Sequence, residues 1–407
     1  MLLRSHIVMS SYRICTVTFD HYFFDPRVRR LAEAAVDGGY DMDVVCVRQP
    51  HEKYQETCNG VHIYRVPMDR GFGRALPLTI LNWCYFLLLA TMTVAWLHRK
   101  HAYTVVHVHN MPDFLVFSAL VPKLLGAKVI LDIQDSSPEL MAVKAKGWIR
   151  TIVIRLARWQ EGISVAFADH IITIGWTLEQ VLLRRGVPKK KVTSIMNSAD
   201  PKFFPPSLRC PLNAETFTEK RPFVLMYHGT LAERQGLDIA IRAVALASSV
   251  VPHIRLDMKG RGEHLPILKA LTEELHIAEK VRFTEMCRYD EVAEFVLRGD
   301  VGIIPYRKDG YMELVLPTKA FEFAWMQRPM ISADMPGMRS LFRAHSVAFC
   351  EPSNPGSFAA AIVDLYTNAE RRIQMVQDAE EDYQAYRWEI MAARYQQVLS
   401  MLSLKMA

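Results

Sequence analysis

The sequence has no close pair of cysteines, no low-complexity segment and no short internal repeat. Its seven cysteines are scattered between Cys15 and Cys350, and none belongs to a C-x-x-C motif. This spacing suggests neither a cysteine-based zinc site nor a disulfide framework, and a reducing cytoplasm fits it best. The first residues, MLLRSHIVMSSYRIC, hold too short an apolar stretch for a convincing signal peptide.

The second half of the chain lacks an excess of either charge. Residues 201–407 hold 25 basic and 26 acidic side chains, whereas residues 1–200 hold 24 basic and 17 acidic ones. The net charge of +6 therefore comes from the first half, where it can face phosphates or an anionic membrane surface. Because half of the 407 residues are hydrophobic, the chain can bury more than one core, which excludes disorder and favours two domains.

Charge is also missing from Ala75 to Leu97, a run of 23 residues that is flanked by Arg70, Arg74, Arg99 and Lys100. Its length would suffice to cross a bilayer, since about 20 apolar residues are enough. However, the following residues, YTVVHVHN, indicate a buried strand of the domain that precedes the run, and a spanning helix would separate the two. We therefore favour a helix that lies in the membrane interface or packs on the domain over a true span.

Apolar strand-like runs alternate with helical runs along the first half of the chain. The strand-like runs are RICTVTF, DMDVVCV, VHIYRV, TVVHVHN, KVILDIQ and HIITIG. Continuous β-branched runs that are separated by helices predict parallel strands covered on both faces. The pattern indicates a doubly wound α/β domain.

The alternation stops at a segment rich in proline and polar residues, Ser198 to Pro222, and then restarts. We predict an N-terminal domain at 1–200, a linker at 201–221, a second doubly wound domain at 222–375, and a C-terminal helix at 376–407 that packs back on the first domain. The expected architecture is α/β, with two Rossmann-like domains facing a central crevice. Ligands of such sheets bind at the carboxyl ends of the strands.

The segment PTKAFEFAWMQRPMISADMPG begins a helix and continues into a buried strand. Pro317 suits a first helical position, and Thr318 and Lys319 then lie in the first turn, where a phosphate would meet the positive end of the helix dipole. Glu322 lies one turn later on the same face, and its carboxylate can accept hydrogen bonds from a ribose diol. The alternative is a capping or surface glutamate.

Two glycine turns follow strand-like runs of the second domain. In YHGTLAERQG, Gly229 and Thr230 precede Arg234 and a helix start, an arrangement that suits a diphosphate because glycine lets the backbone approach an anion closely. An ordinary strand-to-helix turn fits this stretch equally well. KGRGEHLP, with Gly260 and Arg261, is a second such turn and is weaker by itself.

In the first domain, Asp25 is predicted as an N-cap and Pro26 as the first helical residue. Arg27, Arg29 and Arg30 then crowd the helix start, where cations oppose the dipole. An anionic ligand or a membrane would explain them, and so would pairing with neighbouring carboxylates.

Polar side chains follow two further strands of the first domain. His107 and His109 are expected on the same side of a strand end, with Asn110 just beyond, while Gln134 and Asp135 end the next strand. We favour hydrogen-bonding histidines over metal ligands, because no third ligand is evident nearby.

Taken together, several segments resemble the family-four retaining glycosyltransferases of GT-B fold, over nearly the whole chain. These segments are DPRVRRLAEAAVDGGYDMDVVCV, HVHNMPDFLVFSALVPKLLGAKVILDIQD, RRGVPKKKVTSIMN, YHGTLAERQGLDIAIRAVAL and VLPTKAFEFAWMQRPMISADMPG. The resemblance implies a UDP- or GDP-linked sugar donor bound mainly to the second domain and an acceptor bound mainly to the first.

The resemblance also implies roles for single residues. Glu322 matches the glutamate that holds the ribose, His109 matches the histidine that contacts the donor sugar, and Arg234 is the expected phosphate-binding cation. The expected catalytic residues are His109, Arg234 and Lys319; the donor-binding residues are Gly229, Thr230, Arg234, Gly260, Arg261, Thr318, Lys319 and Glu322; the acceptor-side residues are Arg27, Asn110, Gln134 and Asp135. Neither a metal nor a resident cofactor is expected.

The sequence departs from the family pattern at several of these places. Leu314 stands where many members carry a second glutamate, and Glu313 is one residue off. Thr230 and Gln235 replace a basic pair of the glycine loop, and Gln134 stands where many relatives have histidine. Base recognition is expected from backbone groups near 286–288.

The expected function is that of a retaining, metal-independent hexosyltransferase of cell-envelope polysaccharide or glycolipid synthesis, with a glycan or lipid-linked acceptor. We expect it in the cytoplasm, peripheral at the inner face of the membrane through residues 75–97. The alternatives are a catalytically silent binding or scaffold protein, which the departures favour, and a nucleotide-sugar epimerase of the same fold. Nucleic-acid binding is not expected, because the basic residues do not form a recognisable module with exposed aromatics.

Overall fold

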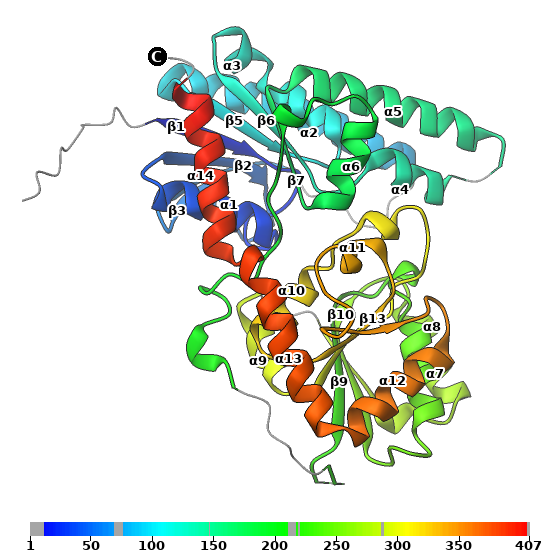
Figure 1. Cartoon of the computed structure of the whole chain (residues 1–407). Coiled ribbons are helices and arrows are strands. Elements are labelled where there is room, and N and C mark those ends of the chain that lie inside the picture. The colour runs from blue at the N-terminus through cyan, green and yellow to red at the C-terminus, as the bar shows by residue number, and fades with distance from the viewer. Residues whose placement is uncertain are drawn as a thin grey trace, which may run out of the picture. The chain divides into compact units, whose positions relative to one another are not determined.

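A computed structural model describes residues 12–68, 76–145, 147–210, 217–218, 220–285 and 289–404. The chain divides into two compact units (Figure 1). The first unit comprises Met1–Ile174, Leu178–Ile195 and Met391–Ala407, and the second comprises Gly175–Thr177 and Met196–Ile390. Residues 286–288, where base recognition was expected, lie outside the described residues.

The first unit contains an eight-stranded sheet in the order β3-β4-β2-β1-β5-β6-β7-β8. Its strands are β1 (Arg13–Val17), β2 (Asp41–Val47), β3 (Gln55–Cys58), β4 (Val61–Val66), β5 (Val105–His109), β6 (Lys128–Ile133), β7 (His170–Thr173) and β8 (Val192–Ser194). The neighbouring strands pair in parallel except β3, which is antiparallel to β4. The predicted doubly wound α/β domain is thereby confirmed.

The edge hairpin of β3 and β4 was not predicted. It turns at Asn59 and Gly60, whose φ angles of 50° and 79° are those of a two-residue turn with a left-handed backbone. An Asn-Gly pair between two strand-like runs carries this signal in the sequence. The short polar strand before it, QETC, has too few apolar residues to reveal itself.

The helices of the first unit cover both faces of this sheet. They are α1 (Pro26–Asp37), α2 (Leu76–His101), the 3-10 helix η1 (Asp113–Ala119), α3 (Leu120–Leu124), α4 (Ser137–Lys144), α5 (Ile149–Phe167), α6 (Trp176–Arg184) and α14 (Trp388–Leu404). The predicted cap of α1 is confirmed, since the Asp25 side chain accepts hydrogen bonds from the backbone N–H groups of Arg27 and Val28. From α14, Gln396 donates to the backbone oxygen of Ala34 in α1 at 2.8 Å.

The second unit contains a six-stranded parallel sheet in the order β11-β10-β9-β12-β13-β14. Its strands are β9 (Phe223–Thr230), β10 (Ile254–Arg261), β11 (Val281–Thr284), β12 (Val301–Ile304), β13 (Met330–Ala333) and β14 (Ala348–Cys350). The direction of strand addition reverses between β9 and β12, and open α/β sheets bind their ligands beyond the carboxyl ends of such strands. In the first unit the same reversal falls between β1 and β5.

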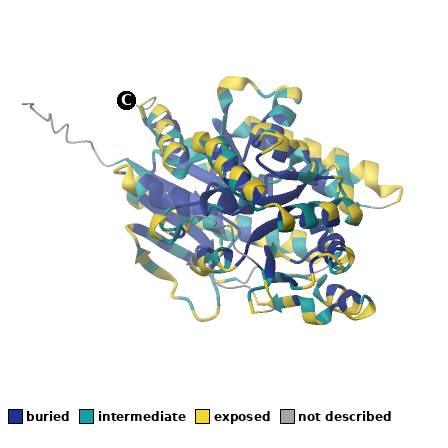
Figure 2. Cartoon of the chain, turned by 60° about the horizontal axis from the view of Figure 1, so that its bottom comes forward, coloured by how far each residue is buried: buried dark blue, intermediate teal, exposed yellow. Residues whose placement is uncertain are grey.

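The helices of the second unit pack on its sheet. They are η3 (Pro206–Leu208), η4 (Glu233–Gln235), α7 (Leu237–Ala247), α8 (Leu265–Glu274), η5 (Ala278–Lys280), η6 (Tyr289–Glu291), α9 (Val292–Leu297), η7 (Met312–Leu314), α10 (Thr318–Trp325), α11 (Pro336–Arg339), α12 (Pro355–Thr367), α13 (Ala369–Tyr383) and η8 (Gln384–Tyr386). The strands are mostly buried while the outer faces of many helices are exposed (Figure 2). Each unit therefore has its own sheet-centred hydrophobic core.

The division of the chain differs from the predicted boundaries at both ends of the second unit. The described part of the predicted linker packs into this unit: Phe204 is buried, and its backbone oxygen accepts a hydrogen bond from Trp325 Nε1 at 2.8 Å. Residues 211–216 and 219 lie outside the described residues. At the other end, α13 stays with the second unit, and only the chain from Met391 onward belongs to the first.

The turn before α7 requires glycine, which gives a first prediction. Gly236 has a φ of 66°, and a Cβ built there would lie 1.9 Å from the backbone oxygen of Pro305. The strain of a left-handed backbone adds to the overlap of the new Cβ with the Pro305 oxygen. We therefore expect Gly236→Ala to reduce the free energy of unfolding by at least about 2 kcal/mol. Chemical denaturation measures this loss.

The matched control is Gly310→Ala in the same unit. A Cβ at Gly310 has no neighbour within 4 Å. The free energy of unfolding of Gly310→Ala should differ from that of the native protein by no more than about 0.5 kcal/mol, as for other open surface positions. Equal losses for the two variants would contradict the requirement at Gly236.

Candidate functional site

In the second unit, a glycine loop follows the central strand β9. Gly229 has a φ of 125°, which side-chain-bearing residues rarely adopt, and a Cβ there would lie 3.7 Å from Lys319 Nζ. The half-buried backbone of Gly229 therefore lies beside the Lys319 ammonium. Thr230 and Arg261 are register partners on β9 and β10, and both are exposed.

The second glycine turn has a packing role of its own. A Cβ at Gly260 would lie 1.9 Å from the backbone oxygen of Gly229. The close approach of β9 and β10 at this point thus requires glycine whatever is bound. The donor-binding role assigned to Gly260 stays a prediction.

Lys319 is a buried cation without a carboxylate partner. It is 8% exposed, and its Nζ donates a hydrogen bond to the Tyr306 hydroxyl at 3.0 Å. The ammonium also lies 4.7 Å from the ring centroid of Tyr227 and 5.0 Å from that of Tyr306. No carboxylate of the described residues lies within 4.0 Å of it. A buried charge of this kind costs free energy unless an anion joins it.

A second cation near the loop also lacks an acidic partner. Arg234 in η4 is half-buried, its guanidinium lies 6.0 Å from the ring centroid of Tyr311, and no described carboxylate is within ion-pair distance. Gln235 is buried, and its Oε1 accepts a hydrogen bond from the Tyr227 hydroxyl at 3.1 Å. The 3-10 helix η4 therefore carries a half-buried arginine next to a buried neutral amide.

Glu322 lies on α10, one turn after Thr318 and Lys319, and is 1% exposed. Its Oε1 accepts a hydrogen bond from the Tyr289 hydroxyl at 2.8 Å, and its Oε2 lies 3.0 Å from His228 Nε2. A surface glutamate is excluded by this burial. An ionised carboxylate accepts about four hydrogen bonds, and Tyr289 and His228 are two of the neighbours of this one.

The start of α10 differs by one residue from the prediction. Pro317 is the N-cap and Thr318 the first helical residue, so Pro317 does not occupy the first helical position. Thr318 is half-buried. The backbone oxygen of Leu314 accepts a hydrogen bond from the Thr177 hydroxyl at 2.9 Å. The carboxylate of Glu313 lies 3.9 Å from Lys308 Nζ.

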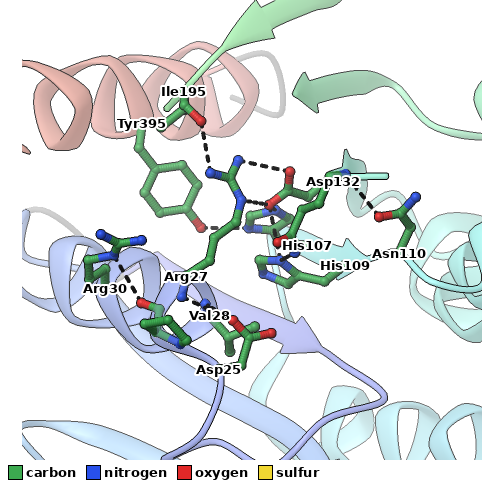
Figure 3. Close-up of polar contacts among 12 residues, drawn as sticks. Asp25, Arg27, Val28, Arg30, His107, His109, Asn110, Asp132, Ile195 and Tyr395 are labelled. Atoms are coloured by element: carbon green, nitrogen blue, oxygen red, sulfur yellow. Dashed lines mark hydrogen bonds and ion pairs between the residues drawn. The ribbon is translucent and has the colours of Figure 1, made fainter. Parts of the chain in front are cut away.

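In the first unit, Arg27 of α1 and Asp132 of β6 form a buried ion pair (Figure 3). The Arg27 guanidinium contacts both carboxylate oxygens of Asp132, with Nε to Oδ2 at 2.7 Å and Nη2 to Oδ1 at 2.9 Å. Its Nη1 donates to the backbone oxygen of Ile195 at 2.8 Å. Arg27 is 2% exposed, so its predicted contact with an acceptor would have to compete with these bonds.

Asp132 also orients His109. His109 Nδ1 lies 3.0 Å from Asp132 Oδ2, and the rings of His107 and His109 stack with centroids 4.4 Å apart. Burial opposes ionisation of Asp132, but Arg27 and the hydrogen bond from His109 hold its pKa well below its usual range. An ionised Asp132 fixes the proton on His109 Nδ1 and leaves a lone pair on Nε2. Among the described residues, His109 Nε2 has no hydrogen-bond partner.

His107 lies deeper in this cluster. Its Nδ1 is 2.9 Å from the hydroxyl of Tyr395 on α14. Burial, and then the neighbouring His109, lower the pKa of His107 well below its usual value. His107 is therefore neutral in the folded protein at physiological pH.

His107, His109 and Asp132 offer ligand atoms within 4.8 Å of one another, which is close enough for a metal ion. However, the Arg27 guanidinium lies 2.7 Å from the Asp132 carboxylate and brings a positive charge to the same oxygens. This donor set does not fit a divalent cation. The expected absence of a metal stays a prediction.

Asn110 joins the remaining residues predicted on the acceptor side. Its Nδ2 donates to Asp113 Oδ1 at 2.8 Å and to the backbone oxygen of Asp135 at 2.7 Å, while its Oδ1 accepts from the backbone N–H of Gln134 at 2.9 Å. Gln134 Nε2 lies 3.4 Å from His109 Nδ1. The structure thus brings Asn110, Gln134, Asp135 and His109 together.

Several residues that shape the two clusters were missed by the sequence analysis. They are Tyr227, His228, Tyr289 and Tyr306 around Lys319 and Glu322, and Asp132 and Tyr395 around His109. The only available signal was position, since Tyr227 and His228 directly precede the glycine loop and Asp132 lies two residues before Gln134.

Comparisons with known proteins identify both halves of the chain. Residues 25–198 match the family "Glycosyl transferase 4-like domain", and residues 212–382 match "Glycosyl transferases group 1". D-inositol 3-phosphate glycosyltransferase 1 of Catenulispora acidiphila is 24% identical over 370 residues, 84% of this chain and 81% of that protein.

Solved structures share the fold over nearly the whole chain. Sucrose-phosphate synthase from Thermosynechococcus elongatus superposes with a TM-score of 0.75 at 18% identity, covering 97% of this chain and 100% of that one. Anabaena HepE in complex with UDP-glucose gives a TM-score of 0.69 at 12% identity, covering 96% and 99%. At these identities the likeness establishes the GT-B fold alone.

The buried ion pair gives a second prediction. Asp132→Asn leaves the Arg27 charge buried without its carboxylate, so the free energy of unfolding should fall by about 3–5 kcal/mol. The control is Asp41→Asn, because the exposed carboxylate of Asp41 lies 3.5 Å from Arg13. This substitution should lower the free energy of unfolding by less than about 1 kcal/mol. Denaturant titration of both variants checks this, and similar losses would contradict it.

The low pKa of His107 predicts a specific pH dependence. Below a pH of about 6.5 the unfolded chain binds a proton at this residue that the folded protein does not, so its contribution to stability is lost as the pH falls. His107→Gln lacks this effect. The stability advantage of the native protein over His107→Gln should therefore shrink between pH 6.5 and 5, by up to about 1.4 kcal/mol per pH unit. A gap that stays constant or widens would contradict it.

Proposed function

Because this chain belongs to the GT-B glycosyltransferases, with a glycosyl transferase 4-like domain followed by a group 1 domain, we propose that it moves a sugar from a UDP- or GDP-linked donor to an acceptor hydroxyl. The observation that carries this proposal is the buried ammonium of Lys319, which faces the Gly229 loop without a carboxylate partner among the described residues. A donor diphosphate supplies the missing negative charge.

The donor is assigned to the second unit. The diphosphate lies against the N–H groups of the Gly229 loop, with Lys319 and Arg234 as its cations. Glu322 accepts hydrogen bonds from the two ribose hydroxyls, while Tyr289 and His228 hold its carboxylate in place. Thr318 lies in the first turn of α10, where the helix dipole favours a phosphate.

The proposed reaction is a metal-independent transfer with retention of configuration. The bond between the anomeric carbon and the diphosphate breaks, and charge builds up on the leaving phosphate, which Lys319 and Arg234 stabilise. The acceptor oxygen attacks the oxocarbenium-like centre on the face from which the diphosphate leaves, and a phosphate oxygen takes its proton. No protein nucleophile is needed.

His109 is assigned to the donor sugar. Its Nε2 lone pair, fixed by the bond from Nδ1 to Asp132, accepts a hydrogen bond from a sugar hydroxyl. Arg27 and Asp132 are positioning residues in this proposal, because they act through His109. The amide cluster of Asn110 and Gln134 lies on the acceptor side.

The acceptor is a glycan or a lipid-linked glycan of cell-envelope polysaccharide or glycolipid synthesis, reached from the cytoplasm. One relative is named for an inositol phosphate acceptor, and one structural neighbour was solved with UDP-glucose. These names support a hydroxyl acceptor and a uridine donor for this chain.

A catalytically silent binding protein is the second candidate, and Leu314 favours it. Many members of the family have a glutamate there. The preceding residue, Glu313 of η7, has its carboxylate 3.9 Å from Lys308 Nζ. Such a protein would bind the nucleotide sugar without turning it over.

Calorimetric titration with UDP, GDP, ADP and their common sugar conjugates tests the donor site. We expect one nucleotide to bind the native protein and Glu322→Gln to bind it at least tenfold more weakly, since a lost charged hydrogen bond costs about 1.5 kcal/mol or more. Glu313→Gln is the matched control and should keep the affinity for the bare nucleoside diphosphate. Equal binding by Glu322→Gln would contradict the assignment of the ribose.

Turnover separates the two candidate functions. With the sugar conjugate that binds, we expect a product only when an acceptor is added, and nuclear magnetic resonance should give its anomeric linkage the same configuration as the donor. Binding without turnover over a broad acceptor panel would favour the silent homologue, and inversion would contradict the retaining mechanism.

A further inference from the structure

One layer of the first unit is formed by α2, η1 with α3, and α5. Both long helices pack against η1. Trp83 of α2 contacts Phe114 of η1 with ring centroids 6.4 Å apart, and Phe117 of η1 contacts Phe167 of α5 at 5.0 Å. The outward side of this layer, between Leu78 and Trp159, is called the α2–α5 face below.

The α2–α5 face is unusually apolar for a surface. Among the described residues, 25 large hydrophobic side chains are exposed, and 16 of them lie between Leu78 and Trp159. On α2 these are Leu78, Ile80, Leu81, Tyr85, Leu88, Met92 and Trp96. Only 17% of the most apolar window of this helix is buried. Such a large exposed apolar area marks an interaction surface.

α5 contributes an amphipathic outer face. Trp148, Ile149, Ile152, Leu156 and Trp159 recur at helical spacing, and the two tryptophans are 82% and 65% exposed. The opposite side packs on the unit through a separate set of buried residues, Ala157, Glu161, Ser164 and Val165. The apolar stripe therefore points away from the unit.

The charges of this face have one sign. Residues 76–167 contain nine basic and five acidic side chains. The five acidic ones are buried or half-buried, whereas Arg99, Lys100, Arg150, Arg155 and Arg158 are all exposed. The Lys100 ammonium lies 3.6 Å from the ring centroid of Trp96. Exposed arginines thus alternate with exposed tryptophan, isoleucine and leucine along α5.

We propose that the α2–α5 face docks on an anionic lipid bilayer, with Trp148 and Trp159 at the headgroup level and the arginines of α5 on lipid phosphates. Tryptophan concentrates at membrane interfaces, and an apolar stripe beside basic side chains is the pattern of a helix that lies on anionic lipid. A second copy of the chain fits less well, because two faces of the same positive sign repel each other.

α2 lies on this membrane and does not cross it. One side of the helix, formed by Phe86, Ala90, Val94 and Leu97, is 0% exposed, since it packs into the unit. Crossing the bilayer would remove these side chains from the core. The helix length alone, 24 residues from Leu78 to His101, would permit a span.

Sedimentation of the full chain with vesicles tests the proposal. The native protein should bind vesicles of phosphatidylglycerol and phosphatidylcholine at least tenfold more strongly than vesicles of phosphatidylcholine alone, and added salt should weaken the binding. Trp148→Ser with Trp159→Ser should lose at least tenfold on the mixed vesicles. Arg150→Gln with Arg155→Gln and Arg158→Gln should lose the preference for anionic lipid.

Matched controls come from the second unit. Leu246 and Ile267 are both 57% exposed, so Leu246→Ser with Ile267→Ser removes two exposed apolar side chains outside the face. Arg298→Gln removes an exposed arginine whose side chain is 76% accessible. All control variants should bind vesicles like the native protein.

Three outcomes would overturn the proposal. In the first, the native protein binds neither type of vesicle. In the second, it binds both types equally well. In the third, the native protein is a dimer and the tryptophan variant is a monomer. Alkaline carbonate should release the vesicle-bound protein, and retention would contradict a helix that lies on the bilayer. The proposal does not depend on the donor site: nucleotide titration of the tryptophan variant should match that of the native protein.

Discussion

The second unit is organised around one buried positive charge. Lys319 is held by the Tyr306 hydroxyl and lies against two tyrosine rings, and no carboxylate of the described residues lies within 4.0 Å of its ammonium. Folding alone gains little from an arrangement of this kind, because a desolvated ammonium without an anion is costly. The Gly229 backbone lies beside this ammonium, and in the proposed function an anionic ligand of the loop supplies the missing negative charge.

The first unit also buries a cation, but it supplies that cation with a carboxylate partner. Arg27 is buried even more deeply than Lys319, but Asp132 neutralises it through two hydrogen bonds and leaves it no role as a free cation. The same carboxylate orients His109, whose Nε2 atom has no hydrogen-bond partner among the described residues. One unit thus leaves a buried ammonium without a carboxylate within ion-pair distance among the described residues, whereas the other pairs its buried guanidinium with a carboxylate that also contacts His109.

The sequence predicted the fold and some of the residues in the clusters around Lys319 and around His109. Continuous β-branched runs predicted both parallel sheets, the Asp25 cap was recognisable from its proline, and the spacing of Lys319 and Glu322 put both on one helix face. Tyr227, Tyr289 and Tyr306 could not be found in this way, because a tyrosine in a strand or loop has the same pattern whether its hydroxyl meets a ligand or the core. Asp132 was hidden for a related reason: its partner Arg27 is 105 residues away, and no local period connects them.

The most direct test of the account is thermal unfolding of Lys319→Met beside the native protein, with and without UDP or GDP. If the ammonium is retained for a donor diphosphate, the nucleotide that binds should raise the unfolding midpoint of the native protein only. The variant without ligand should unfold at the same temperature as the native protein or higher, because a costly buried charge has been removed. A variant that is less stable yet still stabilised by the nucleotide would show that Lys319 serves the fold and not the donor.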